Sequence, residues 1–76
     1  MAASATLDPA APPQPLRVLV VDDHRSVAEA LGIALDATPG VACVGTAGTA
    51  AEALRQVDEH HPDVVLMDAY LPGEWR

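Results

Sequence analysis

The chain has 76 residues, of which eleven are acidic and only four, all arginines, are basic, so its formal net charge is -7. This excess of negative charge argues against non-specific binding to nucleic acid and against attraction to an anionic membrane surface, and it favours cationic partners or metal ions. No apolar stretch approaches the roughly 20 residues that cross a bilayer. We therefore expect one small acidic domain in the cytoplasm.

The amino-terminal segment, residues 1–15, has four prolines in its last seven positions and lacks the basic start and apolar core of a secretion signal. We expect it to form a disordered or polyproline-like leader, with structure beginning near Leu16. Cys43 cannot form an internal disulfide because it has no partner cysteine. Its apolar surroundings favour a buried free thiol over a reactive one, because no electropositive residue is adjacent in sequence.

After the leader, the pattern changes from strand to helix. The run "RVLVV" at residues 17–21 is typical of a strand that is buried on both faces. The segment "SVAEALGIALDATPG" at residues 26–40 predicts a helix that opens with a capping box of Ser26 and Glu29 and ends at Pro39 and Gly40. Its predicted apolar face consists of Val27, Ala30, Leu31, Ala34 and Leu35.

The same unit then repeats. "VACVG" at residues 41–45 predicts a weaker strand that suits the edge of a sheet. A second helix is predicted to open with a capping box of Thr49 and Glu52 and to stop before Pro62. Its predicted apolar face consists of Ala50, Ala53, Leu54 and Val57. "DVVLMD" at residues 63–68 gives a third strand that ends in a carboxylate.

This alternation predicts an α/β fold of the form β-α-β-α-β, with right-handed crossovers and a parallel sheet. With a strand order of 2-1-3, the two helices lie on opposite faces and the first and third strands are neighbours. Doubly wound folds bind ligands at the carboxyl ends of such a central pair. Asp22, Asp23 and Asp68 are all expected there.

Three carboxylates held close together cannot all remain ionised without compensation, because like charges raise one another's proton affinity. A divalent cation supplies that compensation, and hard oxygen ligands favour Mg2+. A carboxylate beside Mg2+ is also a candidate nucleophile toward phosphorus. A single aspartate at a strand end is more often a turn former or a helix cap, but three at adjacent strand ends favour a site.

Three stretches, "VLVVDDHRSVAEAL", "VGTAGTAAEAL" and "PDVVLMDAYLPG", together resemble the receiver domain of two-component response regulators. The resemblance runs from about Arg17 to Gly73. The "DDH" opening and the "PDVVLMD" strand look most like the NarL/LuxR-type class of transcription regulators. The resemblance implies a partial doubly wound, flavodoxin-like fold in which residues 16–76 form a truncated receiver.

The resemblance also implies the role of each acidic residue. Asp68 would accept a phosphoryl group from a histidine kinase, and Asp22 and Asp23 would be the Mg2+-binding pair. The backbone carbonyl of Tyr70 would complete the protein ligands of the ion, and Pro72 fits the turn after the phosphorylated strand. The chain would contact no DNA itself, because a helix-turn-helix would lie in a further domain of the parent regulator.

Members of the family continue with two more strands and three helices, and they carry a Ser or Thr and a Lys that contact the phosphoryl group. This sequence has no lysine and ends at Arg76. We therefore expect a marginally stable or molten monomer in which the residues from Val64 to Met67 form an exposed apolar edge.

Two other functions remain open. The chain could be an interaction module without phosphorylation, which sequesters a kinase or pairs with a full-length regulator. It could also be a Mg2+-dependent phosphohydrolase, although such enzymes favour acidic residues at alternate positions and not adjacent ones. For His24 we expect a local structural role in preference to a catalytic or metal-binding one. His60 and His61 are expected at the carboxyl end of the second helix, where the helix dipole favours positive charge.

Overall fold

The computed structural model of the chain describes residues 14–68, which form a three-stranded sheet and two helices. The elements follow in the order β1 (Leu16–Val21), α2 (Arg25–Asp36), β2 (Val41–Ala47), α3 (Ala50–His60) and β3 (Val64–Met67). The expected leader lies almost entirely outside the described residues, and Tyr70 and Pro72 lie outside them as well.

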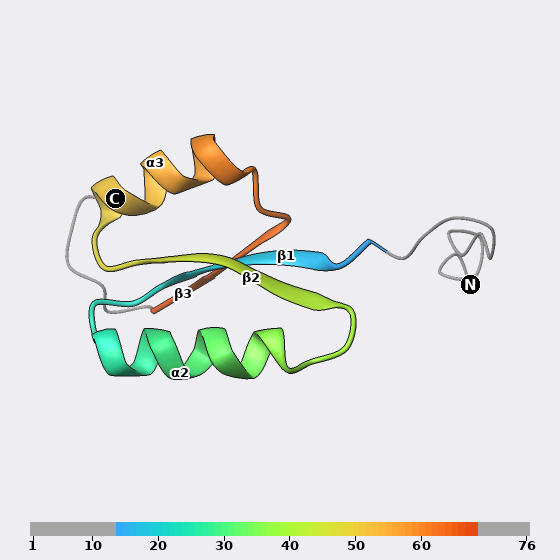
Figure 1. Cartoon of the computed structure of the whole chain (residues 1–76). Helices are drawn as coiled ribbons and strands as arrows, with labels where there is room; N and C mark the ends of the chain where they lie inside the picture. Colours follow the sequence, from blue (N-terminus) through green and yellow to red (C-terminus); the bar gives the residue numbers. More distant parts are fainter. Residues whose placement is uncertain (1–13, 69–76) are drawn as a thin grey trace.

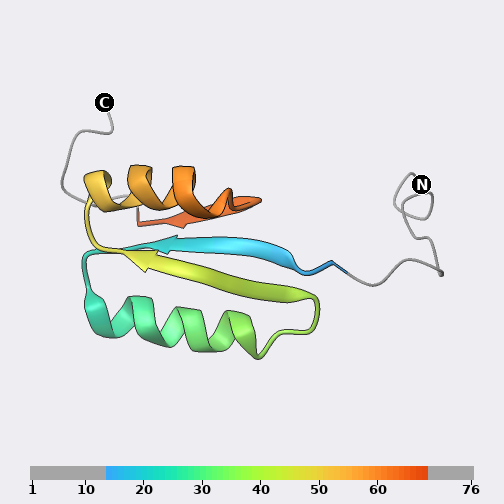
Figure 2. The same cartoon turned by 45° about the horizontal axis from the view of Figure 1, so that its top comes forward.

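The sheet is parallel, with the strand order β2-β1-β3. Helix α2 covers one face and α3 covers the other, as Figure 1 and the turned view in Figure 2 both show. This arrangement confirms the predicted flavodoxin-like α/β fold and its 2-1-3 order. It places β1 in the middle of the sheet, with β2 as one edge strand and β3 as the other.

The core is built around β1. Val18 is 3% exposed, and Leu19, Val20 and Val21 are fully buried. Such complete burial follows from position, because β1 pairs with a strand on each side and lies between the two helices. Small residues complete the core where other elements meet this strand: Ala28, Ala47 and Ala53.

Helix α3 begins with the predicted capping box. The Thr49 hydroxyl accepts a hydrogen bond from the Glu52 backbone N–H at 3.1 Å, and the Glu52 carboxylate accepts one from the Gly48 N–H at 2.8 Å. The carboxylate therefore reaches one residue further back than in the standard motif. The helix ends at His60, and His61 follows in the left-handed conformation with φ 49° just before Pro62.

The capping box predicted for α2 is wrong. This helix begins at Arg25, its N-cap residue is His24 without a side-chain capping bond, and Ser26 is an exposed residue of the first turn. The cause lies in the preceding turn, where the Asp22 carboxylate accepts a hydrogen bond from the His24 backbone N–H at 2.9 Å. That bond turns the chain into the helix earlier than the Ser26 signal suggests.

The predicted apolar faces of the helices are also partly wrong. In α2 the buried residues are Ala28 and Gly32, whereas Val27 is 44% exposed. In α3 the buried residue is Ala53, whereas Leu54 is 64% exposed. Small side chains face the sheet because they let the helix axes approach it closely, and the larger apolar residues are displaced to the sides.

Gly32 shows how close this approach is. A Cβ atom at this position would lie 3.4 Å from Cys43 Sγ on β2. Cys43 is a free thiol that is half-buried, less covered than predicted, and its Sγ lies 3.4 Å from the Gly45 carbonyl oxygen, within hydrogen-bond distance. The close packing of α2 on β2 therefore depends on the small size of Gly32 and Cys43.

Strand β3 is the exposed apolar edge that the sequence predicts. Its four residues, Val64 to Met67, are each 38% to 43% exposed. Both helices pack against β1 and β2, and within the described part of the chain neither packs against β3. Strand β3 thus leaves an outer edge and part of each face open to solvent.

At the opposite end of the sheet from the acidic residues, Arg17 and Asp63 join β1 to the start of β3. The Arg17 N–H donates to the Asp63 carboxylate at 2.9 Å, and the Asp63 N–H donates to the Arg17 carbonyl at 2.8 Å. The Arg17 guanidinium also donates to the carbonyls of His60 and His61. We call this group of contacts the Arg17 clamp; it caps the end of α3 with a cation, where the helix dipole favours positive charge.

Candidate metal centre

The acidic residues meet because β1 and β3 are parallel neighbours. Asp22 directly follows β1 and Asp68 directly follows β3. The Asp68 N–H donates to the Val21 carbonyl at 2.9 Å, and the Asp22 N–H donates to the Ala47 carbonyl at 2.9 Å. These bonds extend the ladder by one step and fix both aspartates at the carboxyl edge of the sheet, where doubly wound folds place their ligands.

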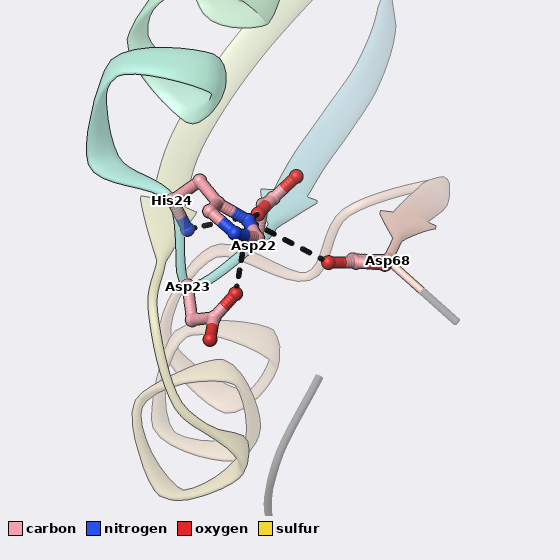
Figure 3. Close-up of polar contacts among 4 residues, drawn as sticks. All are labelled: Asp22, Asp23, His24 and Asp68. Atoms are coloured by element: carbon pink, nitrogen blue, oxygen red, sulfur yellow. Dashed lines mark hydrogen bonds and ion pairs between the residues drawn. The ribbon is translucent and has the colours of Figure 1, made fainter. Parts of the chain in front are cut away.

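Four side chains converge at this edge. One ligand atom from each of Asp22, Asp23, His24 and Asp68 lies within 4.8 Å of all the others. The side chains of Asp22 and Asp68 are 12% and 20% exposed, whereas that of Asp23 is 38% exposed. Figure 3 shows the three carboxylates around the imidazole ring. The structure thus brings together the three aspartates named from the sequence; we call this group with His24 the acidic cluster.

His24 occupies the centre of the acidic cluster. Its Nδ1 atom lies 2.9 Å from Asp22 Oδ1, 3.1 Å from Asp23 Oδ1 and 3.9 Å from Asp68 Oδ2. His24 also has the expected local role, as the N-cap residue of α2. Its place among the carboxylates was not predicted from the sequence, and the signal for it is the position of His24 directly after the acidic pair.

The His24 ring and the carboxylates change one another's pKa. The hydrogen bond to Asp22 raises the pKa of His24, and the negative charges of Asp23, Asp22 and Asp68 raise it further, whereas burial opposes the rise. The pKa of Asp22 is lowered, first by the hydrogen bond from the His24 backbone N–H and then by that from the His24 ring. Each partner of this contact therefore favours the charged form of the other.

Two hollows flank the acidic cluster. One has a volume of about 410 Å³, lies toward β2 and is lined by Asp22 and Asp23 together with Thr46 and Glu52. The other has a volume of about 350 Å³ and lies between α2 and β3. Its lining combines the polar Asp22, His24 and Asp68 with the apolar Val27, Leu31 and Leu66. Both sides of the cluster therefore have space for water molecules or a small anionic group.

The donor set fits a hard divalent cation. Three carboxylates at one edge supply oxygen ligands and the negative charge that Mg2+ requires, and the flanking hollows leave room for the waters that this ion retains. The fourth ligand expected from the sequence, the backbone carbonyl of Tyr70, lies outside the described residues.

Comparison with known proteins gives one family match, to the model of the response regulator receiver domain over residues 18–75. The transcriptional regulatory protein LiaR of Bacillus subtilis is 40% identical over 58 residues, which are 76% of this chain and 28% of LiaR. The response regulator GacA of Pseudomonas viridiflava is 45% identical over 58 residues, or 76% of this chain and 27% of GacA.

Relatives of a different kind match as well. The protein-glutamate methylesterase/protein-glutamine glutaminase 4 of Geobacter metallireducens is 46% identical over 57 residues, which are 75% of this chain and 16% of that protein. The chain thus spans less than a third of the length of each of these relatives, and they do not share one kind of output. No solved structure gives a significant match.

Neither helix of the described residues has the length and apolar character that crossing a membrane requires. The family match covers most of the chain, and the matched region contains the whole acidic cluster and every strand of the sheet except the first residues of β1. The chain therefore belongs to the response regulator receiver domain family.

Proposed function

We propose that this chain is a phosphoryl-accepting signalling domain, in which Asp68 receives a phosphoryl group from a histidine kinase while Asp22, Asp23 and Asp68 hold Mg2+. The observation that carries this proposal is the convergence of three carboxylates at the ends of two neighbouring parallel strands, in a chain of the receiver family. The backbone carbonyl of Tyr70 is proposed as a further ligand of the ion.

The chemistry follows from the arrangement of the carboxylates. An oxygen of Asp68 attacks the phosphorus atom of the donor, the bond between phosphorus and the donor nitrogen or oxygen breaks, and an aspartyl phosphate forms. Bound Mg2+ supplies neutralisation of the charge on the transferred group. Asp22 and Asp23 hold the ion beside Asp68, whose side chain is 20% exposed and so remains open to a donor.

The wider role is proposed from the relatives. LiaR is a transcriptional regulatory protein and GacA is a response regulator, which supports a receiver that is part of a transcription regulator. Its NarL/LuxR-type class and its place in the cytoplasm are proposed from the sequence resemblance alone. On this proposal the domain is a phosphoacceptor and not a multiple-turnover enzyme, and any DNA contact belongs to another domain of the parent protein.

One observation favours the interaction module as a second candidate. The exposed apolar edge of β3 is a surface on which another protein chain can add a strand. A chain that used this surface to pair with a full-length regulator or to sequester a kinase would not need Asp68.

The test is phosphorylation of the purified 76-residue chain by acetyl phosphate with Mg2+, followed by intact-mass spectrometry. We expect a mass increase of one phosphoryl group, which is absent in Asp68→Asn and after removal of Mg2+ by EDTA. The matched control Asp58→Asn, at an exposed position of α3, keeps the increase.

Labelling that persists in Asp68→Asn, or no labelling of a chain that circular dichroism shows to be folded, contradicts the proposal. Kinase binding that survives Asp68→Asn in the absence of labelling supports the interaction module instead.

A further inference from the structure

We propose that His24 sets the metal selectivity of the acidic cluster: it opposes Mg2+ and serves as a nitrogen ligand to borderline transition ions such as Ni2+. This inference rests on the proposed function to the extent that the same carboxylates hold the ion. It adds a residue that is neither acidic nor a backbone carbonyl to the determinants of the site.

The first support is the position of the ring nitrogen. Nδ1 lies 2.9 Å and 3.1 Å from one oxygen each of Asp22 and Asp23, and 3.9 Å from an oxygen of Asp68. A group at this point contacts the same oxygens that an ion needs, and Figure 3 shows the ring lying between the carboxylates. An ion and the ring nitrogen therefore cannot both occupy this position.

The second support is the way His24 is attached. Its backbone N–H donates to Asp22 Oδ1 at 2.9 Å, independently of the ring, and its side chain is 68% exposed. Rotation of the side chain can move the ring aside without moving the residue, because the exposed side leaves it free space. The imidazole thus remains next to the ion site whether or not it occupies its centre.

Ion chemistry then separates two classes of metal. Mg2+ demands oxygen ligands in near-ideal octahedral geometry, so it must displace the ring from the oxygens of Asp22 and Asp23 and gains nothing from the nitrogen. Ni2+ accepts imidazole readily. With its proton on Nε2, the His24 ring can shift away from the carboxylates and bind Ni2+ through Nδ1.

The test compares His24→Ala with the unaltered, untagged chain by isothermal titration calorimetry with Mg2+ and with Ni2+. We expect the affinity for Mg2+ to rise about two- to tenfold, the value of one hydrogen bond removed from competition. We expect the affinity for Ni2+ to fall by about tenfold or more, as the loss of a metal-orienting group does. His24 makes no side-chain capping bond, so the alanine removes no helix cap.

Two further variants sharpen the comparison. His24→Phe keeps a planar ring without nitrogen and should reproduce both shifts, which separates the nitrogen from the bulk of the ring. His61→Asn removes an exposed histidine elsewhere, at a left-handed position that asparagine tolerates, and should leave both affinities unchanged. In the unaltered chain, paramagnetic Ni2+ should broaden the NMR signals of the His24 ring before those of other histidines.

Affinities for the two ions that change in the same direction, or not at all, overturn the inference. If Mg2+ binds and Asp68 is phosphorylated in that case, the proposed function stands and only the role of His24 is lost. If neither ion binds the folded chain, both proposals fail.

Discussion

His24 and the aspartates around it change each other's titration, and the sign of the effect differs for the two partners. The pKa of His24 is raised above 6.5, so its contribution to stability is present below that pH and is lost as the pH rises through the raised value. The pKa of Asp22 is lowered below 3.8, so its contribution is present above that pH and is lost as the pH falls through the lowered value. Both contributions are therefore fully present between pH 3.8 and pH 6.5.

We predict that Asp22→Asn lowers the pKa of His24, because it replaces the charged acceptor of the ring's hydrogen bond by a neutral amide and so removes one of the negative charges that stabilise the imidazolium. NMR titration of the His24 ring protons in the metal-free chain measures this value. Asp58→Asn, on an exposed part of α3, serves as the charge-matched control and should leave it unchanged. An unaltered pKa in Asp22→Asn would mean that the ring does not lie against this carboxylate in solution.

The two helices begin in different ways. Helix α3 has a side-chain cap, in which the Thr49 hydroxyl accepts from the Glu52 N–H. Helix α2 has none, and its start is determined by the turn that Asp22 makes after β1. Stability at the start of α2 is therefore tied to a residue of the acidic cluster, whereas stability at the start of α3 is not.

This difference predicts different results for two similar substitutions. Thr49→Ala should lower the free energy of unfolding by about 1 kcal/mol, because it removes a cap. Ser26→Ala should leave that free energy unchanged or raise it by at most about 0.5 kcal/mol, because Ser26 is an exposed helical residue and alanine is the better helix former. Urea denaturation followed by circular dichroism measures both changes. If Ser26→Ala lowered the free energy of unfolding as much as Thr49→Ala, Ser26 would be the cap of α2 that the sequence predicts.

Taken as one body, the described part of the chain buries the last four residues of β1, from Val18 to Val21, and leaves β3 half uncovered. A net charge of -7 keeps copies of the chain apart, whereas four apolar residues on an open strand edge draw them together. The two forces respond differently to salt, because salt screens the repulsion between charges but leaves the apolar attraction in place. Self-association is therefore expected to increase with ionic strength.

We predict that Val65→Lys reduces this self-association, because it places a charge on the edge strand. Leu54→Lys is the matched control: it changes the net charge equally and replaces a residue that is 64% exposed, but on α3 and away from the sheet edge. Sedimentation velocity at low and high salt compares them. Equal effects of the two variants would show that net charge, and not the edge of β3, governs association.

Long-range features were more predictable from the sequence than local ones. The continuous apolar run of β1 indicated a strand buried on both faces, and the alternation of strands and helices indicated a parallel sheet. With the order 2-1-3, such a sheet brings Asp22 and Asp68 to one edge. The face of α2 was missed by one position because Ala28 and Gly32 pack by being small, which a hydrophobicity pattern does not record. The place of His24 was missed because it depends on a side-chain contact with carboxylates from two strands.

The Arg17 clamp has a consequence for the acidic cluster at the other end of the sheet. It fixes the alignment in which Val18 pairs with Val64 and Val21 with Met67, which in turn delivers Asp68 to the end of β1. A slip of two residues would preserve the faces of β3 but carry Asp68 along the strand by about 6 to 7 Å. The ligand atoms of the cluster lie within 4.8 Å of one another, so such a slip would dismantle it. Arg17 and Asp63 thus set the register of β1 and β3. The assembly of the acidic cluster therefore depends on contacts at the opposite end of the two strands.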